Sequence, residues 1–120
     1  MKKYDLEDRL ISFSVMIVDI VNATSNTKAG NHLAGQLVRS GTSVSLNYGE
    51  AQSAESKRDF IHKMKIILKE LRETHINLKI IHRCNLHKDK NKIIKAKEEN
   101  NQLIAIFVKS ISTAQNNSHL

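Results

Sequence analysis

The chain of 120 residues contains no proline and no tryptophan, only four glycines and a single cysteine. Tight turns and strand interruptions usually recruit proline or glycine, so their scarcity favours long helices. Aromatic residues make up 4% of the chain, and we therefore expect a core of mostly branched aliphatic side chains. The single cysteine, Cys84, excludes an internal disulfide and suits a reducing compartment.

Long apolar runs are missing as well. No run approaches the ~20 apolar residues that a membrane-spanning helix needs. The first residues lead directly into charged side chains, which is not the pattern of a signal peptide. We therefore expect a soluble, cytoplasmic protein with no membrane partner, and its length is typical of one domain.

Apolar residues recur with alternating spacings of four and three in four segments, which lines one face of each helix. Helices are expected over about residues 5–23, 31–53, 57–84 and 90–112. The third begins with a typical start signal, because Ser56 is followed three positions later by Asp59. The side chains expected to face inward are Leu6, Leu10, Phe13, Ile17, Ile20, Leu33, Leu37, Ser40, Val44, Asn47, Ala51, Phe60, Met64, Ile67, Leu71, Thr74, Leu78, Ile81, Ile93, Ala96, Leu103, Ile104, Phe107, Val108 and Ile111.

Connections of modest length between successive helices favour antiparallel neighbours. The predicted fold is all-α, an antiparallel up-and-down four-helix bundle. It forms a single domain over residues 1–112, followed by a polar, frayed C-terminal tail over 113–120.

The first two helices carry more than a monomeric bundle requires. A helix interior glycine costs about 1 kcal/mol relative to alanine, so Gly35 and Gly41 indicate close approach of a neighbouring backbone. An apolar surface wider than the usual stripe indicates a subunit contact, and we expect the bundle to oligomerise. The extra apolar side chains of the first helix are Ile11, Met16, Val18 and Val21.

Catalytic patterns are absent from the sequence. There is no nucleophile-elbow motif, no phosphate-binding glycine loop and no Glu-x-x-His pair of the kind that di-metal bundles use. His82, Cys84 and His87 cluster near the end of the third helix, where histidines commonly complement the helix dipole. We expect Cys84 to be buried or half-buried, and we expect no enzyme activity, no metal and no cofactor. The weakest alternative is a bundle enzyme that holds a metal or a ligand.

The net charge of +7 is unevenly distributed. Residues 1–56 carry five basic and six acidic side chains, whereas residues 57–120 carry 14 basic and six acidic ones. Several basic residues of the third helix recur every seven positions and share one face, and further lysines follow in the fourth helix. Clustered positive charge attracts polyanions, so RNA or DNA is a candidate partner. The expected nucleic-acid contacts are Arg58, Lys65, Lys69, Arg72, Lys79, Arg83, Lys92 and Lys95, with Lys88, Lys90 and Lys97 nearby.

A second group of polar residues has a structural interpretation. Asn47 falls on the inward spacing, and Glu50 lies near the break between the second and third helices. Buried polar groups require partners, and Arg39 or Arg72 can supply them to these residues and to Glu70 and Glu73 on the third helix. We expect Arg39, Asn47, Glu50 and Glu70 to lock a hairpin or an intersubunit contact.

Several short motifs resemble one known family. They are Gln36-Leu37-x-Arg39-Ser40, Asn47-x-x-Glu50, Asp59-Phe60 and Glu70-Leu71. The chain resembles, over about residues 6–108, the bacterial four-helix-bundle family named for proteins encoded by intervening sequences in large-subunit ribosomal RNA genes. Ala51 stands where the family usually has glycine and Tyr48 where it usually has isoleucine, and both changes are compatible with a helix.

The resemblance implies a non-enzymatic homopentamer with a basic surface. A related bundle is the accessory subunit of diversity-generating retroelements, so the resemblance also implies nucleic acid and a reverse transcriptase as partners in that setting. The leading hypothesis is an oligomeric nucleic-acid-binding protein. The alternative is a structural module whose partner is another protein and whose basic residues confer solubility.

Overall fold

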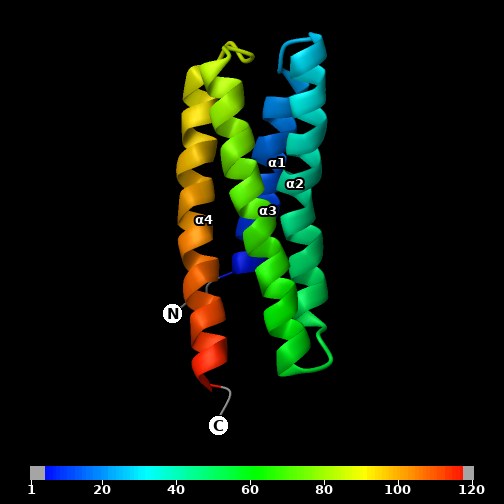
Figure 1. Ribbon diagram of the computed structural model, residues 1–120, viewed down its shortest axis with the longest axis vertical. Coiled ribbons are helices and arrows are strands. Elements are labelled where there is room, and N and C mark those ends of the chain that lie inside the picture. The colour runs from blue at the N-terminus through cyan, green and yellow to red at the C-terminus, as the bar shows by residue number, and fades with distance from the viewer. Residues whose placement is uncertain (1–4, 118–120) are drawn as a thin grey trace.

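The computed structural model describes residues 5–117, and these form four helices that pack against each other in antiparallel order (Figure 1). They are α1 (Leu6–Asn22), α2 (Lys28–Gln52), α3 (Lys57–Arg83) and α4 (Lys90–Asn116). The helices α1 and α2, α2 and α3, and α3 and α4 pack closely, whereas α1 contacts α4 less extensively. The four-helix fold expected from the periodicity is confirmed.

Side-chain caps start all four helices. Asp5, Thr27, Ser56 and Asp89 each accept a hydrogen bond from the backbone N–H three residues further on. Such a cap satisfies one of the free N–H groups of the first turn. The cap at Thr27 makes α2 begin at Lys28, three residues before the expected start.

The end of α4 differs from the expectation. This helix continues to Asn116, whereas the sequence pattern placed its end at Ser112 and a frayed tail after it. Ala114 is half-buried beside Ala51 and Phe60 at the end of the bundle, and this packing supports the additional turn. Residues 118–120 of the expected tail lie outside the described part of the chain.

Seventeen buried apolar side chains, drawn from all four helices, form one core. Several positions differ from the expected inward pattern, among them Ser14 and Asn77, which are also buried. Val108 is 43% exposed, because it lies at the outer edge of α4 beside Leu68 and Arg72. Asn100 is fully buried instead, and its Nδ2 donates a hydrogen bond to the Leu71 carbonyl oxygen at 2.9 Å.

Gly41 allows α1 and α2 to approach closely. A Cβ atom at this position would lie 2.7 Å from Cγ2 of Ile17. Nothing in the described chain lies within 4 Å of the corresponding position at Gly35. The close-approach explanation therefore holds within the protomer for Gly41 and does not hold there for Gly35.

The two connections at one end of the bundle are joined to each other. Thr24 and His87 form an isolated antiparallel bridge, and the backbone N–H of Ser25 donates to the Leu86 carbonyl oxygen at 2.7 Å. His87 is buried, and its Nδ1 accepts a hydrogen bond from the Asp89 backbone at 3.0 Å. Cys84, expected to be buried or half-buried, is exposed because it caps the end of α3.

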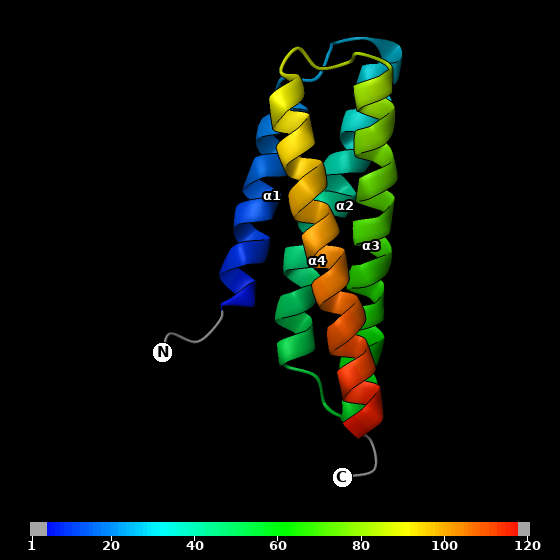
Figure 2. The same cartoon turned by 90° about the vertical axis from the view of Figure 1, so that its left-hand side faces the viewer.

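At the opposite end, α1 stops short. It has 17 residues, whereas α2, α3 and α4 have 25, 27 and 27. Figure 2 shows α1 beginning well above the lower ends of the other helices, so the lower part of the bundle consists of α2, α3 and α4.

Candidate nucleic-acid interface

A row of basic side chains runs along the outer face of α3. Four of them occur every seven residues, which spaces their backbones by ~10.5 Å along the helix axis. We call this set the basic row: Arg58, Lys65, Lys69, Arg72, Lys79 and Arg83. Five of these six side chains are exposed, and Lys79 is half-buried.

Within residues 5–117, no member of the basic row makes an ion pair or a side-chain hydrogen bond. The acidic residues of α3 face α2 instead, where Glu70 and Glu73 bind Arg39. Other cations of α3 are engaged, because Lys63 pairs with Glu50 and Lys57 donates to the Asn117 carbonyl oxygen. The basic row therefore keeps its hydrogen-bond donors available to a ligand.

Lys92, expected to extend this surface onto α4, points in another direction. Its Nζ lies 2.9 Å from Oδ2 of Asp19, so the side chain points towards α1, on the other side of α4 from α3. This hydrogen bond, together with the carboxylate charge, raises the pKa of Lys92. Lys95 lies three residues after Lys92 and four residues before Glu99, and Glu99 binds Arg9 of α1. Helical spacing therefore places Lys95 on the α1 side as well.

Lys97 joins the basic row instead. His75, half-buried on α3, has its pKa lowered first by burial and then by the positive charges of Lys79 and Lys97. The charges of both lysines therefore act on one imidazole and add to the same positive potential. His75 Nδ1 is buried without a hydrogen-bond partner in the described chain. The spacing of seven between Lys90 and Lys97, which parallels that on α3, is the signal in the sequence.

The polar residues assigned a structural role connect α2 to α3. Arg39 donates to Glu70 Oε1 at 3.2 Å and also binds Glu73, and these bonds raise the pKa of Arg39, with Glu73 the larger cause. Lys63 Nζ donates to Glu50 Oε1 at 2.8 Å, which raises the pKa of Lys63. These pairs span the α2–α3 hairpin. Asn47 is half-buried, and no hydrogen bond of its side chain occurs among residues 5–117.

The opposite face of the bundle carries an apolar groove between α1 and α2. Its cavity volume is about 320 Å³, and it is floored by small polar side chains and flanked by exposed aliphatic ones. Val15 is 62% exposed and Leu46 is 71% exposed. The apolar groove is lined by Ile11, Ser14, Val15, Val18, Thr42, Ser45 and Leu46.

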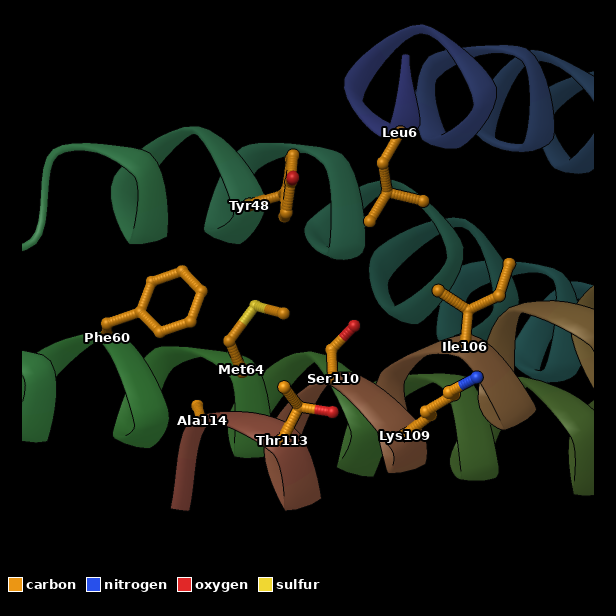
Figure 3. Close-up of a pocket in the computed structure, with 9 residues that line it drawn as sticks. All are labelled: Leu6, Tyr48, Phe60, Met64, Ile106, Lys109, Ser110, Thr113 and Ala114. Atoms are coloured by element: carbon orange, nitrogen blue, oxygen red, sulfur yellow. The ribbon is translucent and has the colours of Figure 1, made fainter. Parts of the chain in front are cut away.

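A second, larger groove opens where α1 stops short, with a volume of about 480 Å³. Figure 3 shows Tyr48 of α2, Phe60 and Met64 of α3 and Ile106 of α4 converging on it below Leu6. Hydroxyl groups and Lys109 complete the lining. No acid and base face each other across the described lining, so this groove offers an apolar surface rather than a reaction site.

Residues 5–117 hold no candidate metal site. These residues contain no group of three or more His, Cys, Asp or Glu side chains that could hold a metal ion. None of the four described helices is long and apolar enough to cross a membrane.

The fold and the surface define a class of protein: a four-helix bundle that displays a row of free basic side chains on one face and an apolar groove on the other. Within this class, the chain belongs to the family of 23S rRNA-intervening sequence proteins, whose family model matches residues 2–109. The resemblance noted from the sequence motifs is therefore confirmed.

A solved structure agrees with this assignment. It is a protein of unknown function from the S23 ribosomal protein family of Bacteroides thetaiotaomicron VPI-5482. It is 28% identical to this chain, superimposes with a TM-score of 0.81 and covers 89% of this chain and 98% of its own. No curated protein matches the sequence.

Proposed function

We propose that this protein is a non-enzymatic homo-oligomer that binds the phosphate backbone of nucleic acid through the basic row of α3, with Lys97 of α4. The observation that carries the proposal is the separation of charges on α3. Lys63 of α3 and Arg39 of α2 are each paired with carboxylates across the α2–α3 contact, whereas the members of the basic row have no partner among the described residues. Free cations along a rigid helix suit successive phosphates.

Self-association completes the proposal. The apolar groove exposes Val15 and Leu46, and contiguous exposed apolar surface commonly marks a protein contact. The family resemblance implies five copies in a ring. Several basic rows in one particle would then bind one polyanion with avidity greater than that of a single row.

Salt titration tests nucleic-acid binding. Labelled DNA and RNA oligonucleotides should bind at low salt, and log K should fall linearly with log salt concentration, because binding releases counterions. The double variant Lys65→Glu/Arg72→Glu should reduce this slope by about two. The control, Lys63→Gln/Lys92→Gln, removes two charges that are paired elsewhere and should leave the slope unchanged. Absence of binding at the lowest salt concentration would refute the proposal.

A protein-interaction module is the second candidate, and the apolar groove favours it. Under this alternative the partner is another protein, such as a reverse transcriptase if the gene lies in a retroelement. Charge reversal at Lys65 and Arg72 would then leave the protein contact intact. The same double variant therefore separates the two functions.

A further inference from the structure

Taking the proposed nucleic-acid binding as its basis, we infer that the ligand of the basic row is a double-stranded nucleic acid, bound by its backbone along one helical turn. Three properties of the basic row support a duplex ligand: the spacing of its charges, the residues that surround it and the rigidity of its helix.

The length of the row matches a duplex. At 1.5 Å per residue, the helix advances ~31.5 Å from Arg58 to Lys79 and ~37.5 Å from Arg58 to Arg83, the last member of the row. One turn of duplex repeats after about 34–36 Å. Flexible arginine and lysine side chains readily cover a difference of a few ångströms, so the two ends of the row can contact the same strand one turn apart. Lys65 and Arg72 lie between them, where the complementary strand crosses the row.

The surroundings of the row lack the groups that hold single strands. Proteins that bind single strands stack the bases on aromatic rings, at about 1–3 kcal/mol per base. Phe13 and Phe107 are buried in the core, and Tyr48 and Phe60 line the groove at the end of the bundle (Figure 3). No phenylalanine or tyrosine ring among residues 5–117 therefore lies beside the basic row.

One exposed imidazole lies next to the row, since His75 and His82 are half-buried. His62 is exposed and lies four residues after Arg58 and three before Lys65, so helical geometry makes all three neighbours. One ring at one end of the row gives a single strand one base to stack, whereas the remaining charges lie ~10.5 Å apart. A flexible strand would have to become ordered along the row with little compensation.

A duplex avoids both difficulties. Its backbone is already rigid, and it carries one charge per ~1.7 Å of axis, about twice the axial density of one strand. The row makes no demand on base identity, since arginine and lysine here meet phosphates and no helix enters a groove. The inference therefore predicts binding without sequence preference, for DNA or RNA duplexes alike.

The first experiment compares strandedness at constant sequence. Fluorescence anisotropy would be measured for duplexes of about 20 base pairs, DNA and RNA, and for each separated strand at equal phosphate concentration and low salt. We expect each duplex to bind at least about tenfold more tightly than either of its strands. The variant His62→Ala should not change this ratio.

The outcomes separate the inference from its basis. Strands that bind as tightly as the duplex, with affinity lost in Lys65→Glu/Arg72→Glu, would overturn the duplex inference and leave the proposed function standing. A loss of strand binding alone in His62→Ala would show that stacking matters and would also overturn it. Failure of every oligonucleotide to bind would remove the proposed function and the inference together.

The second experiment tests the contact length. Arg58→Gln and Lys79→Gln should each lower the salt slope by about 0.9 on a duplex of two turns. A duplex of about seven base pairs is shorter than a turn, so it can contact only one end of the row. On this duplex the combined decrease in salt slope caused by the two substitutions should be half of that on the two-turn duplex. Lys63→Gln, which removes the same charge from the paired side of α3, serves as the control. An equal loss on both duplexes would overturn the one-turn contact.

Discussion

The α3 face and the α1–α2 face of this bundle expose side chains of opposite character. The α3 face displays charge, and its cations are separated from Glu70 and Glu73 of the same helix, which bind Arg39 of α2. The α1–α2 face displays aliphatic side chains over a floor of small residues. A surface that only needed to stay soluble would mix both signs of charge and avoid apolar patches. The contrast is what the proposed function expects, with nucleic acid on the α3 face and another subunit on the α1–α2 face.

The largest expected effect concerns the apolar groove. Val15→Asp/Leu46→Asp places two carboxylates in it, and because both side chains are already exposed, the protomer should still fold. We expect the assembly to dissociate completely, to the protomer mass of 13.6 kDa in sedimentation velocity. The control, Ile94→Asp, changes an exposed aliphatic residue outside the groove and should leave the assembly intact. An unchanged mass for the double variant would place the subunit contact elsewhere.

A pair of glycine substitutions sharpens the same comparison. Gly41→Ala should destabilise the protomer by about 1–3 kcal/mol, because its Cβ would collide with Ile17. Gly35→Ala has open space around it and should stabilise the isolated helix by about 1 kcal/mol. Chemical denaturation measures both free energies of unfolding. If Gly35→Ala weakens assembly while it stabilises the fold, Gly35 contacts another subunit.

His75 reports on the charged face. Burial, Lys79 and Lys97 hold its pKa below the ordinary 6.5, so the folded state stays neutral where the unfolded state takes up a proton. The free energy of unfolding should therefore fall as the pH drops below 6.5, and it should level off once the pH is below the pKa of His75 in the folded state. Lys79→Gln should raise the pKa of His75 in an NMR titration, and so should a bound duplex. Lys63→Gln should leave it unchanged, and a similar shift in this control would mean that His75 does not sense the row.

The smallest effect is expected at the ion pair between α1 and α4. Lys92→Gln breaks the contact with Asp19, and because exposed ion pairs contribute little, the midpoint of thermal unfolding should not change measurably. Nucleic-acid affinity should also be retained, since Lys92 points away from α3. A clear loss of affinity would mean that the nucleic-acid-binding surface includes Lys92 and reaches α1, so that the two faces are not separate.

Most of the fold could be predicted from the periodicity of the sequence, because apolar residues repeated at spacings of three and four identify the buried side of a helix before any neighbour is known. Periodicity failed where a polar side chain is buried through a partner distant in sequence, as at Asn100, whose amide reaches the Leu71 carbonyl. The ends of α2 and α4 were misplaced because Thr27 and Thr113 lie in polar stretches that resemble loops.

The candidate site divides along the same line. A spacing of seven keeps residues on one face of a helix, so the row from Arg58 to Lys79 was predictable from α3 alone. The direction of Lys92 was not, since it depends on Asp19, 73 residues earlier in the chain. The same holds for Lys97, whose relation to His75 requires the packing of α4 on α3.

The shortness of α1 gives the bundle two unlike ends. At one end the bridge between Thr24 and His87 joins both connections, so the helices there cannot separate independently. At the other end three helices enclose a groove without a fourth to close it (Figure 2). Thermal fluctuations should concentrate at this open end, and its amide hydrogens should exchange with solvent before those near the bridge. We therefore expect the bundle to loosen first at its open end.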